Sequence, residues 1–175
     1  MSTGSFKKPL EARKLASQNA VIKGTLNSEQ IVRFAAAVVG EFDPINCEMT
    51  FYRAEDGHPK VSGSLSGKVH LRCERCLEPV EHSVETSFDV RPVLTDAQAE
   101  AHQKSADIVM LDEEGGLDAI AMLEDELLLD LPIVIYHDYD CRPVMQFGDD
   151  VVEEDAQTEN PFAILASLNR PEKEE

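Results

Sequence analysis

The fold is decided by residues 60–90, which read KVSGSLSGKVHLRCERCLEPVEHSVETSFDV. Apolar and polar residues alternate before the pair Cys73 and Cys76, and a second alternation follows it. A period of two is typical of strands with one buried face, and a short polar segment between two such runs is typical of a hairpin turn. These residues therefore predict a long β-hairpin with a Cys-x2-Cys motif at its tip.

Patterns on either side of the hairpin extend this prediction. Residues 47–52 alternate in the same way and lead into a turn at 55–59, so we expect a third antiparallel strand. Apolar residues at helical spacing predict one helix from an N-cap at Ser28 to Gly40, and a second helix over 117–131. The sequence thus predicts an α+β fold, an antiparallel β-meander or small barrel with one helix before it and one or two after it.

The C-terminal half has weaker patterns. Residues 97–105 predict a loop or a short exposed helix, and residues 133–136 predict a short strand or a buried extended segment. We interpret residues 1–146 as a single domain and residues 147–159 as an acidic flexible linker. In the last segment, 160–175, an Asn-Pro start predicts a short docking helix and tail whose apolar face carries Phe162, Leu165 and Leu168.

Composition excludes several classes of protein. The 175 residues are 42% apolar, which is enough for a core, but they contain no run of about 18 apolar residues that would span a membrane. The N-terminus lacks the apolar stretch of a secretory signal. Four cysteines without such a signal indicate a reducing compartment and not a disulfide framework. We expect a cytoplasmic protein.

Charge is distributed unevenly along the chain. Residues 1–92 contain 12 Lys and Arg and 12 Asp and Glu, whereas residues 93–175 contain 4 and 22, so that half carries the whole net charge of −18. An acidic surface of this kind attracts cationic partners and repels phosphate backbones. The alternative is that these residues only keep the protein soluble.

Four residues have the chemistry and spacing of a zinc site. Zinc prefers four sulfur or nitrogen ligands in a tetrahedron. Cys73 and Cys76 with His137 and Cys141 supply three sulfurs and one nitrogen, although the two pairs are far apart in the sequence. The sequence therefore makes zinc a possible cofactor that joins the hairpin tip to the segment after the second helix.

Other interpretations of the same residues stay open. Cys73 continues the apolar face of its strand and Cys141 could be a small core residue, because free cysteines are often buried. Cys47 and His82 fall on apolar strand faces, and we interpret them as core residues, His82 as a histidine whose ring has hydrogen-bond partners within the core. A redox pair is disfavoured, because a thioredoxin-like Cys-x2-Cys opens a helix, whereas here Pro79 and a strand follow.

No arrangement of residues indicates catalysis. The acidic groups at 112–114 and 124–126 have no recognisable nucleophile, base or oxyanion donor around them. A Gly-rich phosphate loop and a Gly-x-Ser-x-Gly motif are both absent from the sequence. We expect no catalytic residues and no small-molecule substrate.

Basic residues near the hairpin tip could contact RNA or a protein partner. The candidates are Lys68, His70, Arg72 and Arg75, together with the N-terminal Lys7, Lys8, Arg13, Lys14 and Lys23. The alternative is neutralisation across the hairpin: if Cys73 pairs with Val80, Arg72 faces Glu81 and Lys68 faces Glu85. Aromatic residues for base stacking are scarce, since the chain has no Trp.

The motifs in combination resemble one known family. They are CERCLEP at 73–79, EDELLL at 124–129 followed by Leu131-Pro132, then His137 and Cys141, and NPFAILASL at 160–168. In this order they are similar to the YceD family, the bacterial large ribosomal RNA subunit accumulation proteins, over most of the chain.

The resemblance implies a non-enzymatic factor that supports synthesis, processing or stability of 23S rRNA and assembly of the large subunit. The implied partner is a large-subunit ribosomal protein or a pre-50S particle, with 23S rRNA contacted directly or indirectly and no membrane involved. Two other classes stay open, a zinc-stapled protein-interaction adaptor not tied to ribosomes and, less favoured, a thiol oxidoreductase.

Overall fold

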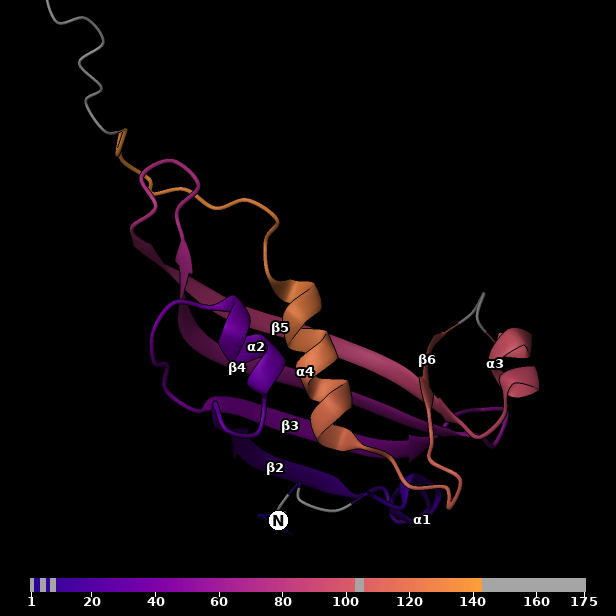
Figure 1. Ribbon diagram of the computed structural model, residues 1–175. Helices are drawn as coiled ribbons and strands as arrows, with labels where there is room; N and C mark the ends of the chain where they lie inside the picture. The colour runs from indigo at the N-terminus through magenta and orange to yellow at the C-terminus, as the bar shows by residue number, and fades with distance from the viewer. Residues whose placement is uncertain (1, 4–5, 7–8, 103–105, 143–175) are drawn as a thin grey trace, which may run out of the picture. The chain divides into compact units, whose positions relative to one another are not determined.

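A single open sheet organises the protein (Figure 1). The computed structural model describes residues 2–3, 6, 9–102 and 106–142. In these residues six strands lie side by side in chain order, namely β1 (Ser2–Thr3), β2 (Val21–Leu26), β3 (Ile45–Arg53), β4 (Pro59–Arg72), β5 (Pro79–Val93) and β6 (Asp107–Met110). The pairs from β2 to β5 are antiparallel, and the short edge strands β1 and β6 pair in parallel. The predicted α+β meander is confirmed, as an open sheet and not a barrel.

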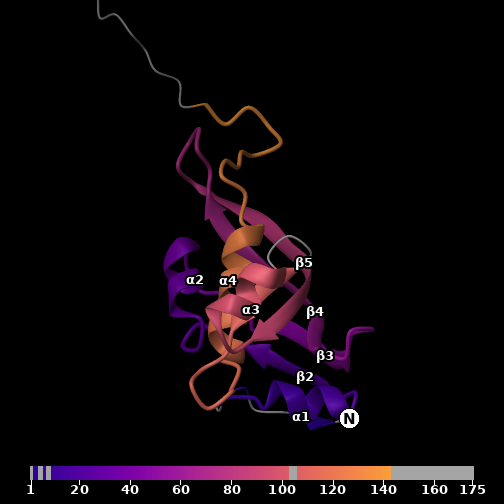
Figure 2. The ribbon, with the colours of Figure 1, turned by 90° about the vertical axis from the view of Figure 1, so that its right-hand side faces the viewer.

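In the part of the chain that the structure describes, two helices precede the main hairpin and two follow it. Their bounds are α1 (Ala12–Ser17), α2 (Val32–Ala37), α3 (Asp96–His102) and α4 (Ala119–Asp130). Figures 1 and 2 show α2 and α4 over the same face of the sheet. The helix predicted over 117–131 is confirmed as α4, and the short exposed helix predicted within 97–105 is α3. Helix α1 and strand β2 were not predicted.

The core lies between this sheet face and the two helices. Alternate residues of β3 and β4 turn inward, as the period of two predicts. They pack in one buried cluster with α2 and α4, whose largest fully buried members include Phe34, Ile45, Met49, Phe51, Leu65, Leu123 and Leu127. The opposite face of the sheet is polar and carries cross-strand ion pairs between Lys23 and Glu48 and between Lys60 and Asp89.

The register of the hairpin differs from the one considered from sequence. Leu71 pairs with Val80 and Arg72 with Pro79, so Cys73 does not pair with Val80. Arg72 therefore does not face Glu81. Lys68 does form an ion pair with Glu81, at 2.9 Å, but diagonally across the strands. The tip sets this register, because its turn is centred one residue earlier in the chain: the last paired residues are Arg72 and Pro79, and the Cys73 N–H donates to the Glu78 carbonyl beyond them.

Helix α2 begins later than the sequence indicated. Asn27, and not Ser28, is the residue whose side chain caps the preceding turn. The Gln30 N–H donates to Asn27 Oδ1 at 3.2 Å, and the Asn27 N–H donates to Gln30 Oε1 at 3.1 Å. The helix itself starts at Val32 with no cap from its own segment. Ser28 was therefore wrong as the N-cap.

A buried carboxylate from α4 caps α2 instead. Glu124 is only 6% exposed, and its Oε1 accepts the backbone N–H groups of Arg33 at 2.6 Å and Phe34 at 3.1 Å. The Arg33 guanidinium donates to Glu124 Oε2 at 2.9 Å and also pairs with Asp125. The backbone N–H groups of the first turn of α2, which have no acceptor within the helix, therefore bind the buried Glu124 carboxylate, and the carboxylate gains hydrogen-bond donors for its charge. This carboxylate therefore has a structural role, whereas the neighbouring Asp125 is exposed.

Gly63 and Gly67 of β4 lie close to atoms of neighbouring strands. They differ in whether an added methyl group would contact backbone or the end of a side chain. At Gly63 a Cβ would contact the Glu48 carbonyl oxygen, which is backbone, and would lie 2.5 Å from Phe88 Cζ. At Gly67 it would contact Ile45 Cδ1, the end of a side chain. We expect Gly63→Ala to lower the free energy of unfolding by about 2–3 kcal/mol and Gly67→Ala by clearly less.

Urea unfolding of the two variants beside the unmodified protein measures this difference. An equal or larger loss for Gly67→Ala would contradict the packing described for β4.

Candidate metal centre

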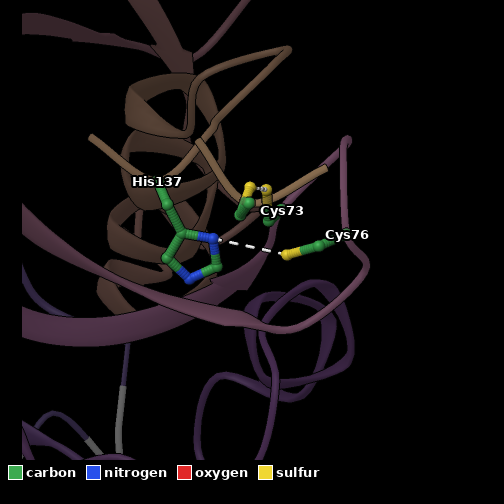
Figure 3. A group of neighbouring side chains, drawn as sticks. Cys73, Cys76 and His137 are labelled. Atoms are coloured by element: carbon green, nitrogen blue, oxygen red, sulfur yellow. Dashed lines mark hydrogen bonds between the residues drawn. The ribbon is translucent and has the colours of Figure 1, made fainter. Parts of the chain in front are cut away.

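The four predicted metal ligands converge at the hairpin tip. Cys73 directly follows β4 and Cys76 lies in the tip turn, whereas His137 and Cys141 come from the segment after α4. Their ligand atoms all lie within 4.8 Å of one another. Figure 3 shows the His137 ring facing the Cys76 sulfur, with the Cys73 sulfur beside them. The structure thus brings together two pairs that the sequence could not place relative to each other.

The distances fit a zinc tetrahedron. The sulfurs of Cys73 and Cys141 are 3.6 Å apart, and Cys76 Sγ is 3.4 Å from His137 Nδ1. Zinc bonds to sulfur at about 2.3 Å and to histidine nitrogen at about 2.0 Å, so the edges of its tetrahedron are roughly 3.5–3.8 Å. Small side-chain rotations would complete the geometry. The cluster could bind a metal such as zinc.

The tip backbone positions the two hairpin ligands. The Cys73 N–H donates to the Glu78 carbonyl at 3.0 Å, and the Leu77 N–H donates to the Cys73 carbonyl at 2.9 Å. This tight turn puts Leu77 in the left-handed region, with φ of 67°. The Arg75 N–H donates to Cys73 Sγ at 3.4 Å. Backbone donors of this kind stabilise a thiolate.

The segment after α4 is held against this tip. The Glu74 N–H donates to the Ile135 carbonyl at 3.0 Å, and Arg75 Nη1 donates to the Tyr139 carbonyl at 3.3 Å. The Arg75 guanidinium also lies over the Tyr136 ring, 5.0 Å from its centroid. Arg75, considered from sequence as an RNA or partner contact, therefore makes contacts within the protein that join the two halves of the site.

The prediction of a strand or buried segment over residues 133–136 is wrong. None of these four residues is assigned to a strand, and Ile133 and Val134 are exposed. Only Ile135 packs against the core. The physical reason is that this segment is anchored by the hairpin tip and the ligand cluster, and not by pairing along the sheet.

Hydrogen bonding selects the nitrogen of His137 that is free to bind a metal. Nε2 lies 3.1 Å from the Pro79 carbonyl oxygen. A carbonyl only accepts, so Nε2 carries the proton and Nδ1 presents its lone pair to the cluster. The Tyr139 ring, 4.8 Å from the His137 ring, restricts its rotation. A hydrogen bond from the second ring nitrogen to a carbonyl, such as the one between Nε2 and Pro79, is the usual support of a metal-bound histidine.

The thiols differ in their tendency to ionise. Burial opposes ionisation of Cys73, but the backbone N–H groups of Cys76 and Arg75 outweigh it and lower the pKa of Cys73 to about 5. Burial raises the pKa of Cys76, and a hydrogen bond with Cys141 raises the pKa of His137. A thiolate is the form that binds metal. Loading the centre would therefore displace a proton from Cys76.

The other sulfur and imidazole candidates lie elsewhere. Cys47 is buried in the core of the sheet, and burial raises the pKa of its thiol to about 12. It is a core residue, as predicted. His82 lies on the core face opposite Val69. Its Nε2 is buried with no hydrogen-bond partner among the described residues, so the expectation of a satisfied core histidine is not met.

Among the described residues, the candidate basic side chains lie at two separate ends of the sheet. Figure 1 shows α1, which carries Arg13 and Lys14, at the opposite end of the sheet from the hairpin tip. Lys14 pairs with Glu11 at 3.1 Å, and Arg72 is exposed near the tip. A contact of these residues with RNA or a partner stays a prediction. Outside the described residues lie Lys7, Lys8, the linker over 147–159, and the docking helix with Phe162, Leu165 and Leu168.

Fold and cluster define a small α+β protein with an open sheet and a candidate zinc knuckle at one hairpin tip. The profile of the family described as "Large ribosomal RNA subunit accumulation protein YceD" matches residues 61–169. The chain belongs to the YceD family, as its motifs predicted.

A relative from Haemophilus influenzae, the large ribosomal RNA subunit accumulation protein YceD, is 32% identical over 151 residues. The match covers 84% of this chain and 86% of the relative. No solved structure matches the chain significantly. Among the described residues, no helix has the length and apolar character needed to cross a membrane.

Proposed function

We propose that this protein is a non-enzymatic factor in the accumulation of 23S rRNA and the assembly of the large ribosomal subunit. The observation that carries the proposal is family membership, together with the named role of the relative from Haemophilus influenzae. The factor would act in the cytoplasm by binding a ribosomal protein, a pre-ribosomal particle or rRNA, and would support synthesis, processing or stability of the RNA.

The acidic residues that could serve a hydrolase have structural partners instead, which supports action by binding and not by catalysis. Asp112 Oδ1 accepts the N–H groups of Glu114 at 3.0 Å and Gly116 at 2.6 Å, which shapes its own loop. Glu124 is occupied as the cap of α2. Both carboxylates therefore have structural partners and are not poised as a catalytic pair.

The metal centre fits a structural role within this function. We propose that Cys73, Cys76, His137 and Cys141 hold one zinc ion. Four protein ligands leave no open position for water or substrate, which is typical of structural zinc and not of catalytic zinc. The ion would hold the hairpin tip and the segment after α4 in one fixed arrangement.

Sedimentation tests the proposed function. A tagged copy of the full chain, at its natural level, is expected to co-sediment with pre-50S particles in a sucrose gradient and to be depleted from the mature 70S fraction. A tagged cytoplasmic protein of similar size and net charge is the control, because an acidic protein has no general affinity for RNA. Absence of the protein from all ribosomal fractions would contradict the proposal.

A further inference from the structure

Large apolar side chains are exposed between the last turn of α4 and the candidate metal ligand His137. Within eight consecutive residues, four such side chains face solvent, and we call them the apolar ledge: Leu129 at 80% exposed, Ile133 at 97%, Val134 at 50% and Tyr136 at 48%. Single exposed apolar residues are normal on a protein surface, whereas large apolar side chains exposed close together and flanked by polar residues are typical of interaction sites.

The ledge is held in place, which distinguishes it from a loose loop. Its first residue belongs to α4, and Pro132 restricts the backbone directly after that helix. Farther along, the Ile135 carbonyl accepts the Glu74 N–H and the Ile135 side chain packs against the core. A surface that is ordered before binding loses less conformational entropy when a partner docks.

The charge around the ledge selects the partner. Residues 118–141 contain seven Asp and Glu and no Lys or Arg. Three cations from outside or beyond this range lie near it: Arg33 and Arg142 pair with Asp125 and Asp140, and Arg75 lies over the Tyr136 ring and donates to the Tyr139 carbonyl. Asp130 and Asp138, which flank the ledge in sequence, have no ion-pair partner among the described residues. Such a surface repels a phosphate backbone and attracts a cationic chain.

We propose that the apolar ledge is a docking surface for a cationic, amphipathic segment of a protein partner. Apolar side chains of the segment would cover Leu129 and Ile133, and its Lys or Arg residues would approach Asp130 and Asp138. This inference rests on the proposed function, because proteins of the large ribosomal subunit are a source of such segments. It names a protein, and not RNA, as the direct contact.

Site-specific cross-linking tests the ledge in the full-length protein. A photoreactive amino acid replaces Ile133, and a second variant carries it at Leu94, an exposed residue of the loop between β5 and α3. We expect the Ile133 probe to cross-link one Lys- and Arg-rich segment that the Leu94 probe does not reach. Cross-links mainly to RNA, mainly to residues 160–168 of the same chain, or equally from both positions would overturn the inference.

Affinity for the identified segment completes the test. A synthetic peptide of the cross-linked sequence is expected to bind the full-length protein. Its affinity should fall at least ten-fold for the double variant Leu129→Ser with Ile133→Ser. Its affinity for the unmodified protein should also fall as the salt concentration increases. Leu94→Ser should bind as the unmodified protein does. Unchanged affinity of the double variant would overturn the inference.

The same double variant separates this inference from the proposed function. If it co-sediments with pre-50S particles as well as the unmodified protein does, the ledge is not the contact and the proposed function stands. If the unmodified protein itself is absent from those particles, the proposed function fails. Cross-linking and peptide affinity alone then test whether the apolar ledge is a docking surface. Thermal melting and zinc content of the double variant show whether its fold is retained, and we expect both to match the unmodified protein.

Discussion

Replacing Cys76 by serine is expected to remove the metal from this protein and to release the segment after α4 from the hairpin tip. Cys76 Sγ is one corner of the proposed tetrahedron, 3.4 Å from His137 Nδ1. Loss of residues that merely support metal ligands lowers affinity about 10–100-fold, so loss of a ligand itself should exceed about 100-fold. Elemental analysis of full-length protein purified without chelator is expected to give about one zinc per chain before the replacement.

Hydrogen exchange shows the structural consequence. The Glu74 amide, which donates to the Ile135 carbonyl at 3.0 Å, is expected to lose its protection in Cys76→Ser, because the metal no longer joins the two segments. Amides in the centre of β4 should keep theirs.

Cys47→Ala is the matched control for the zinc measurement. Cys47 is a buried cysteine of β3 that pairs with Leu65 of β4 and lies outside the ligand cluster, so its loss removes a thiol but no ligand. This variant should retain a full equivalent of zinc. A zinc content below a tenth of an equivalent in the unmodified protein, or an unchanged content in Cys76→Ser, would contradict a zinc centre at the tip.

Replacing Glu124 by alanine is expected to be among the most destabilising single changes on α4. It leaves the N–H groups of Arg33 and Phe34 at the start of α2 without their acceptor. Buried donors left unpaired cost about 1–3 kcal/mol each, so we expect the free energy of unfolding to fall by about 2–4 kcal/mol.

Asp125→Ala is the matched control, because it removes the neighbouring carboxylate of the same helix. Asp125 is exposed, and its ion pair among the described residues is with the guanidinium of Arg33. An exposed pair contributes about 0–1 kcal/mol, so this change should be small. Urea unfolding of both variants measures the difference, and equal losses would show that Glu124 does not cap α2.

The sequence predicted the strands and helices whose burial pattern is visible in the spacing of residues close together in the chain. The alternation on both sides of Cys73 and Cys76 reflects burial of one strand face, and the apolar stripe ending before Pro132 reflects packing of one helix face. Both signals are periodic and local. The ligand set was also predictable as a set, because sulfur and imidazole chemistry is restrictive.

What the sequence could not predict depends on partners distant along the chain. The cap of α2 comes from Glu124, about ninety residues later, whereas the local sequence pattern indicated Ser28. Residues 133–136 are apolar, yet they are fixed by the Glu74 amide and by His137, which no periodicity encodes. The mixed α1 and β2 region lacks a clear stripe of either period. Aromatic neighbours of His137, at 136 and 139, were the one overlooked local signal of the site.

The ratio of 23S to 16S rRNA after depletion of this protein tests the central claim most directly. The account predicts that mature 23S rRNA falls relative to 16S rRNA, that the unmodified gene restores the ratio, and that Cys76→Ser does not. Cys47→Ala is expected to restore it. An unchanged ratio on depletion, with the protein reduced below detection, would contradict a role in the accumulation of large-subunit RNA.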